Sequence, residues 1–135
     1  MPGETDLQTL LANLQPVLDP EPYVFVTLPR GATLPPGIVP LATFAESEGL
    51  SAVLPAAAWT ALDGAPAARY ARLTMMVASS LEAVGMTAAI AEALTAAGIS
   101  ANVIAAYHHD HIFVPWTRRL EALAAIENLG RRQAR

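Results

Sequence analysis

The side chains best suited to chemistry stand in the segment His108-His109-Asp110-His111, between two apolar stretches. Imidazole and carboxylate groups suit acid–base catalysis near neutral pH, and they also bind zinc or nickel. Because alternate residues of a strand share a face, His109 and His111 could bind one metal ion together. A tight hairpin tip cannot direct all four side chains at one ion, so we expect no metal and no other cofactor. Asp110 is then a turn former or the partner of a cationic ligand group.

A second group of polar residues and glycine precedes an alanine-rich helical pattern. Ser79 and Ser80 could hold a ligand carboxylate through hydroxyl and amide groups, or could simply cap the helix. Glu82 could pair with a ligand ammonium group, or it could only complement the helix dipole. Gly85 permits close backbone approach to a ligand, although turn geometry alone also explains it.

Composition excludes several classes of function. The 135 residues carry a net charge of −4, and all eight basic residues are arginine, so the chain lacks the basic surface of a nucleic-acid-binding protein. The sequence has no cysteine, no nucleophile elbow and no phosphate-binding loop, and we therefore expect no enzyme. The lack of cysteine suits a cytoplasmic protein. No signal peptide or membrane-spanning run of about 18 apolar residues is expected.

The first half of the chain predicts two helices and three strands. The segment Thr5-Asp6-Leu7-Gln8 has the form of a capping box, with Thr5 as the N-cap. It opens a helix whose apolar face is Leu7, Leu10, Leu11, Leu14 and Leu18, and Pro16, Pro20 and Pro22 end that helix. A strand over 23–28, a hairpin of 39–45 with 50–54 and a helix over 55–62 follow. Residues 63–66 form the clearest internal boundary.

The second half predicts a strand, a helix, a hairpin and a final helix. The strand over 69–78 is apolar on nearly both sides, which favours a central position in a sheet. The helix over 86–97 ends at Gly98, and the hairpin pairs 101–107 with 111–114. Thr117 caps a last helix that Gly130 ends. Trp59 and Trp116 are interpreted as core or interface anchors.

These elements favour an α+β, ferredoxin-like fold, with helices on one face of a mostly antiparallel sheet. The second half is one strand short of that pattern, and we expect the strand over 23–28 to fill the open edge. The expected organisation is an N-terminal lobe of residues 1–62, a linker of 63–68, a C-terminal domain of 69–130 and a flexible tail of 131–135. An apolar content of 53% in a short chain also predicts a homodimer.

Several segments of the sequence have the pattern of a known family of small domains. They are Leu73–Val77, Ser79–Gly85 and Ala106–Pro115 in the second half, and Pro22–Leu28, Ala42–Phe44 and Glu48–Leu50 in a degenerate first lobe. Nearly the whole chain resembles a family of small bacterial tandem-ACT proteins, formerly classed as a domain of unknown function. It is also similar to the animal tandem-ACT arginine sensors.

The resemblance implies a non-catalytic regulatory protein that binds an amino acid, or a similar small effector, between paired ACT lobes. In such proteins the loop after the first strand contacts the ligand through its backbone, and the facing hairpin supplies side chains. The implied ligand-binding residues are Ser79, Ser80, Leu81, Glu82, Val84, Gly85, Met86, Tyr107, His109 and Asp110. A structural or partner-binding module without a small-molecule ligand is the alternative.

Overall fold

The computed structural model describes residues 5–133, in two compact units. The first unit joins the chain up to Pro20 with the chain from Ala71 onward, and the second is Glu21–Tyr70. The described residues form the strands β1 (Pro16–Pro29), β2 (Ala42–Glu46), β3 (Gly49–Pro55), β4 (Tyr70–Met75), β5 (Asn102–Ala105) and β6 (Asp110–Pro115). The helices are α1 (Leu7–Ala12), α2 (Ala56–Ala61), α3 (Met86–Ala96) and α4 (Arg119–Gln133), with a short 3₁₀ helix, η1 (Trp116–Arg118).

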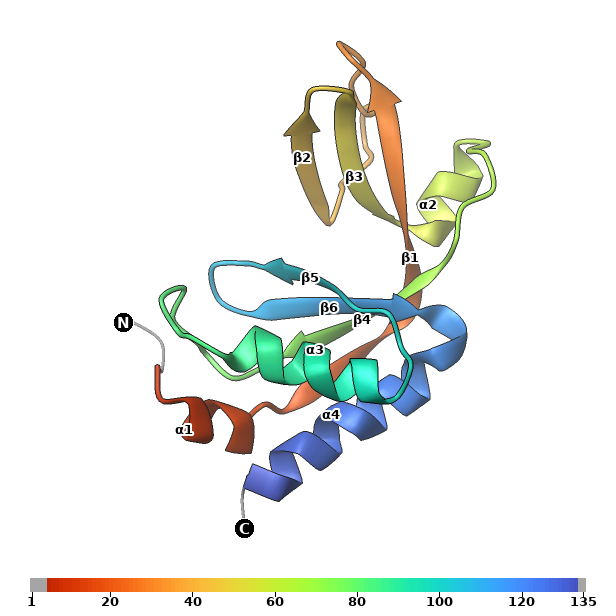
Figure 1. Ribbon diagram of the computed structural model, residues 1–135. Helices are drawn as coiled ribbons and strands as arrows, with labels where there is room; N and C mark the ends of the chain where they lie inside the picture. Colours follow the sequence, from red (N-terminus) through yellow and green to blue (C-terminus); the bar gives the residue numbers. More distant parts are fainter. Residues whose placement is uncertain (1–4, 134–135) are drawn as a thin grey trace. The chain divides into compact units, whose positions relative to one another are not determined.

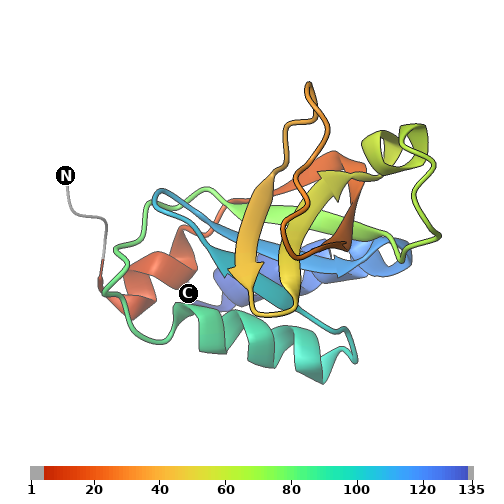
Figure 2. The same cartoon turned by 90° about the horizontal axis from the view of Figure 1, so that it is seen from above.

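The first unit has the ferredoxin-like arrangement that the sequence predicts. Its strands follow the order β1-β4-β6-β5, so β4 is central, as expected. The hairpin of β5 and β6 is antiparallel, with Val103 opposite Ile112. Helices α1, α3 and α4 lie together on one face of this sheet (Figure 1 and Figure 2). The expected α+β fold is therefore confirmed.

Apolar side chains from the sheet and from all three helices form the core of the first unit. In β4 the alternating pattern of the sequence puts Ala71, Leu73 and Met75 on the helix-facing side, where each is fully buried. Ile90 and Leu94 of α3 pack against this side, together with other residues of the cluster: Leu10, Leu11, Leu14, Met86, Ile99, Ile112, Val114, Ala122, Ile126 and Leu129. The core fixes α3 and the sheet as one framework.

The second unit is a smaller sheet with one helix. Its strands follow the order β2-β3-β1, and both pairings are antiparallel. Val24, Ala52, Leu54 and Ala56 form its core. Trp59 packs against that core, and its indole Nε1 donates a hydrogen bond to the Ala65 carbonyl oxygen at 2.7 Å. Trp59 is thus a core anchor, as the sequence analysis proposed.

The beginning of the chain differs from the prediction in two ways. Asp6, not Thr5, is the N-cap of α1, because its carboxylate accepts hydrogen bonds from the Thr9 amide at 2.9 Å and the Thr9 hydroxyl at 2.7 Å. Helix α1 also ends earlier than predicted, at Ala12, and the prolines predicted to end it lie inside β1.

Strand β1 accommodates its prolines because its first part lies at the edge of the first unit's sheet. Pro16 and Pro20 are an even number of residues apart, so their nitrogens face the same side of the strand, and an edge strand needs no amide donors on its outer side. On the inner side, Asp19 forms a 2.7 Å ion pair with Arg72 of β4. The expected edge is thus filled by β1, but through Pro16–Pro20 and not through residues 23–28, which pair with β3.

The last helix also differs at both ends. Thr117 is not its cap, since it lies inside η1, which begins after Pro115. Gly130 does not end the helix, which continues to Gln133. A Cβ at Gly130 would lie 3.2 Å from the Leu11 carbonyl oxygen, so glycine here permits α1 to approach α4 closely. The remainder of the predicted tail, residues 134–135, lies outside the described residues.

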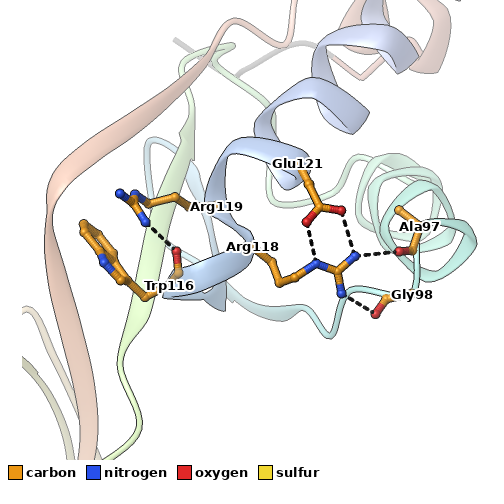
Figure 3. Close-up of polar contacts among 6 residues, drawn as sticks. All are labelled: Ala97, Gly98, Trp116, Arg118, Arg119 and Glu121. Carbon is orange, nitrogen blue, oxygen red and sulfur yellow. Dashed lines mark hydrogen bonds and ion pairs between the residues drawn. The ribbon is translucent and has the colours of Figure 1, made fainter.

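Arg118 connects the end of α3 to the start of α4. Its guanidinium donates to the carbonyl oxygens of Ala97 at 3.0 Å and Gly98 at 3.3 Å, and it forms a two-pronged ion pair with Glu121 (Figure 3). Cations near a helix C-terminus satisfy its free carbonyl groups. Beside it, Arg119 stacks 3.9 Å from the centre of the Trp116 ring. The contacts of Arg118 thus hold the C-terminal end of α3 to the start of α4.

Candidate functional site

A cavity of 130 Å³ lies in the first unit at the N-terminal end of α3. It is bounded by the loop that follows β4, the first turn of α3 and the hairpin of β5 and β6. The lining residues are Ser79, Ser80, Leu81, Ala83, Gly85, Met86, Thr87, Ala105 and Asp110. Two segments that are separated in sequence thus line one cavity, which is open on one side.

The loop before α3 is folded by its own hydrogen bonds. The Ser80 hydroxyl accepts from the Glu82 amide at 3.1 Å, and the Ser80 carbonyl accepts from the Ala83 amide at 3.0 Å. Neither serine caps α3, which was one of the two readings of Ser79 and Ser80, because the N-cap of this helix is Gly85. Both serines instead line the cavity.

The N-terminus of α3 carries no side-chain cap. Its N-cap is Gly85, which adopts the left-handed conformation with φ 99° and has no side chain to offer. The first intrahelical bond joins the Ala89 amide to the Gly85 carbonyl at 2.9 Å. The amides before Ala89 therefore have no acceptor within the helix, and such an end attracts an anion.

Asp110 is the first residue of β6 and not a turn former. The turn before it is closed by a 3.1 Å bond from the Ala106 amide to the His109 carbonyl, and Asp110 pairs with Ala105 across the hairpin. Asp110 lies on the same side of the strand as Ile112 and Val114, so its side chain faces the helices. Only 8% of Asp110 is exposed, yet it lines the cavity.

The Asp110 carboxylate forms no hydrogen bond or ion pair with any residue in 5–133. Burial raises the pKa of this carboxyl above its ordinary value, while the charge of His109 lowers it by a smaller amount. A buried acid without a partner is costly for the fold. A ligand cation in the cavity would supply the missing partner.

The implied binding residues divide into two groups. Ser79, Ser80, Leu81, Gly85, Met86 and Asp110 lie around the cavity, whereas Glu82, Val84, Tyr107 and His109 are not among its lining residues. Val84 and Tyr107 are largely exposed. The cavity is also lined by Ala83, Thr87 and Ala105, which the sequence did not predict as site residues. Hairpin register could have identified Ala105, because the residue opposite Asp110 must share its face.

The histidines do not form a metal centre with the acid. The His111 Nδ1 lies 3.0 Å from the Thr74 hydroxyl oxygen, on the sheet face opposite Asp110. Burial lowers the pKa of His111, and the charges of Arg72 and His109 lower it further. Within residues 5–133, no three His, Asp or Glu side chains are arranged to hold a metal ion.

Comparisons with known families match both halves of the chain. Two models described as ACT domains match residues 2–63 and 68–128. No curated protein matches the chain. None of the helices formed by residues 5–133 has the length and apolar character needed to cross a membrane.

Several solved structures are similar to this one. A protein of unknown function from Vibrio cholerae, described as a "possible transport protein", is 44% identical, with a TM-score of 0.79 over 89% of this chain and 92% of that one. A protein from Agrobacterium tumefaciens is 16% identical, with a TM-score of 0.63 over 82% and 84% of the two chains. The regulatory subunit of aspartate kinase from Thermus thermophilus is 12% identical, with a TM-score of 0.60 over 84% and 95%, and shows the fold alone.

Proposed function

Because this chain belongs to the ACT-domain family, with two ACT domains in tandem, we propose that it is a non-catalytic regulatory protein that binds an amino acid beside Asp110. The observation that carries the proposal is the buried Asp110 carboxylate, which faces a cavity and has no partner among residues 5–133. An ammonium group placed against this largely buried carboxylate gains a charge-assisted hydrogen bond.

The carboxylate of an amino acid would also find hydrogen-bond donors in the cavity. The uncapped first turn of α3 offers amide groups around Gly85, Met86 and Thr87, and these line the cavity together with Asp110. A ligand carboxylate at this end would accept hydrogen bonds from those amides and interact favourably with the helix dipole. The hydroxyl groups of Ser79 and Ser80 supply further donors. One small ligand therefore satisfies both ends of the site.

A regulatory role also requires a target protein. The aspartate kinase relative is itself a regulatory subunit, and by analogy we propose that effector binding here changes the affinity for a protein partner. The similar protein from Vibrio cholerae is described as a possible transport protein, so the proposed partner could equally be a protein involved in transport. We place this regulation in the cytoplasm, as the composition of the sequence favours.

Self-association is part of the proposal, and β2 is the surface that fits it. This strand lies at the end of the order β2-β3-β1, and Phe44 at its centre is 73% exposed. Two copies of β2 aligned antiparallel about Phe44 would place Glu46 opposite the partner's Ala42, so no like charges meet. An exposed apolar edge strand is a template for such pairing.

A binding screen tests the amino-acid proposal. A ligand that binds only the folded chain raises its melting temperature in a concentration-dependent way, and the twenty amino acids can be compared in one assay. We expect Asp110→Asn to abolish the shift while the protein stays folded. The matched control, Glu92→Gln, makes the same chemical change at an exposed position of α3 and should bind normally. The proposal fails if no amino acid shifts the wild-type transition, or if Asp110→Asn binds as the wild type does.

A further inference from the structure

The size of the cavity beside Asp110 sets a limit on the side chain of its ligand. We infer that the effector is a small amino acid of the size of glycine, alanine or serine. This inference rests on the proposed function. This goes beyond the class of ligand, because amino acids share the two charged groups but differ in volume. The inference depends on what surrounds the charged ends of the site.

The volume is the first observation. The cavity measures 130 Å³, and a cavity of about 150 Å³ in another protein holds one benzene molecule. By that comparison, the cavity takes a ligand of about five to seven non-hydrogen atoms. Glycine, alanine and serine fall in this range. Leucine, phenylalanine and arginine exceed it.

The walls explain why the space is small. On one side a Cβ at Gly85 would lie only 3.1 Å from the Leu7 side chain, so α1 packs against this wall residue and restricts its movement. Ala83 packs against the core and cannot withdraw without opening a void. Ala105 stands directly opposite Asp110 and contributes only a methyl group. The two charged groups of the ligand occupy most of what is left.

A longer side chain would have to leave through the open side of the cavity, past Leu81, which is largely exposed. There it stays in contact with water, gains little apolar burial and loses rotamer freedom. Fitting it inside would force the packed walls apart, which is also unfavourable. Larger amino acids should therefore bind about tenfold more weakly or worse, as is typical when a pocket is overfilled.

Two variants at Ala105 test the limit in opposite directions. Ala105→Gly enlarges the cavity and should move the preference toward larger amino acids. Ala105→Val fits an extended strand but fills the cavity, so it should retain glycine and lose serine by about tenfold or more. Ala68→Val is the control, since Ala68 is also an exposed alanine but lies outside the cavity and outside β2. It should leave the ranking of ligands unchanged.

Isothermal titration of the wild-type chain and these variants with glycine, alanine, serine, leucine, phenylalanine and arginine decides the matter. The expected result is that the three small amino acids bind and that the Ala105 variants shift the ranking as described. If a large amino acid binds the wild type at least as tightly and Asp110→Asn abolishes that binding, the size limit is wrong and the proposed function stands. If no amino acid binds, both are wrong.

Discussion

Asp110 and Ala105 lie directly opposite each other in the hairpin of β5 and β6, and both line the cavity at the start of α3. This pairing places a buried acid next to the smallest chiral side chain, so the carboxylate faces open space. Had a larger residue stood opposite, the acid would be covered and the cavity filled. The arrangement sacrifices stability at one position for a site that a cation can enter.

The first prediction concerns stability without ligand. Because burial raises the pKa of Asp110, the folded chain holds this proton more tightly than the unfolded chain, and stability is lost as the pH rises through the raised pKa. Asp110→Asn should therefore raise the free energy of unfolding by about 1 kcal/mol at neutral pH, because it removes a charge that burial disfavours. The gain should vanish once the pH falls below the ordinary pKa of an aspartate. Urea unfolding across this pH range measures it, and a destabilised Asp110→Asn at neutral pH would contradict it.

The second prediction concerns Gly85. Alanine at its φ of 99° should cost about 1–2 kcal/mol, the usual penalty for a left-handed residue, and its Cβ would crowd Leu7 beside the cavity. Gly31→Ala is the matched control, since its φ is 82° and nothing lies within 4 Å of the added Cβ. Both variants should lose stability in thermal unfolding. Only Gly85→Ala should also lose ligand affinity, and equal affinities in the two variants would show that Gly85 serves the turn alone.

The third prediction separates helix propensity from packing at Gly130. In an open helical position, replacing glycine by alanine stabilises a protein by about 1 kcal/mol. Here the new Cβ would lie 3.2 Å from the Leu11 carbonyl oxygen, so α1 must shift to make room. Gly130→Ala should therefore give no net stabilisation in chemical unfolding, and Gly130→Val should be clearly destabilising. A full gain for alanine would mean that α1 does not restrict this position.

The fourth prediction concerns the edge strand β2. Phe44→Lys should convert a dimer to a monomer, because a lysine at the centre of an exposed edge opposes its own copy in an antiparallel pair. Val39→Lys introduces the same charge at an exposed residue outside β2 and should leave the dimer intact. Light scattering at micromolar concentration distinguishes these states. A monomeric wild type would rule out the interface.

The periodicity of apolar residues was sufficient to predict the elements that pack into the core. The alternation in β4 and the apolar arc of α3 predicted both elements and their buried faces, because burial imposes these periods directly. The prediction for Pro16–Pro20 was wrong because of the prolines. A strand tolerates proline at the edge of a sheet, and only the tertiary structure shows that this segment lies at an edge. Gly130 was wrongly predicted to end a helix. A glycine is favoured there because Leu11 approaches closely, and this contact is part of the tertiary structure.

The candidate site was only partly predictable from the sequence. The loop of Ser79–Met86 and the acid Asp110 were singled out by residue type and order along the chain. Their meeting in one cavity depends on the packing of α3 against the sheet, and the cavity's small walls, such as Ala83 and Ala105, have no chemical signature of their own. Alanine in a sequence does not reveal whether it covers a core or borders a void.

A crystal structure of the chain with its most tightly bound amino acid tests the central claim most directly. We expect the ligand's ammonium group within hydrogen-bonding distance of the Asp110 carboxylate, and its carboxylate against the amides of Gly85, Met86 and Thr87. A ligand bound away from Asp110, with the cavity at α3 empty, would contradict it.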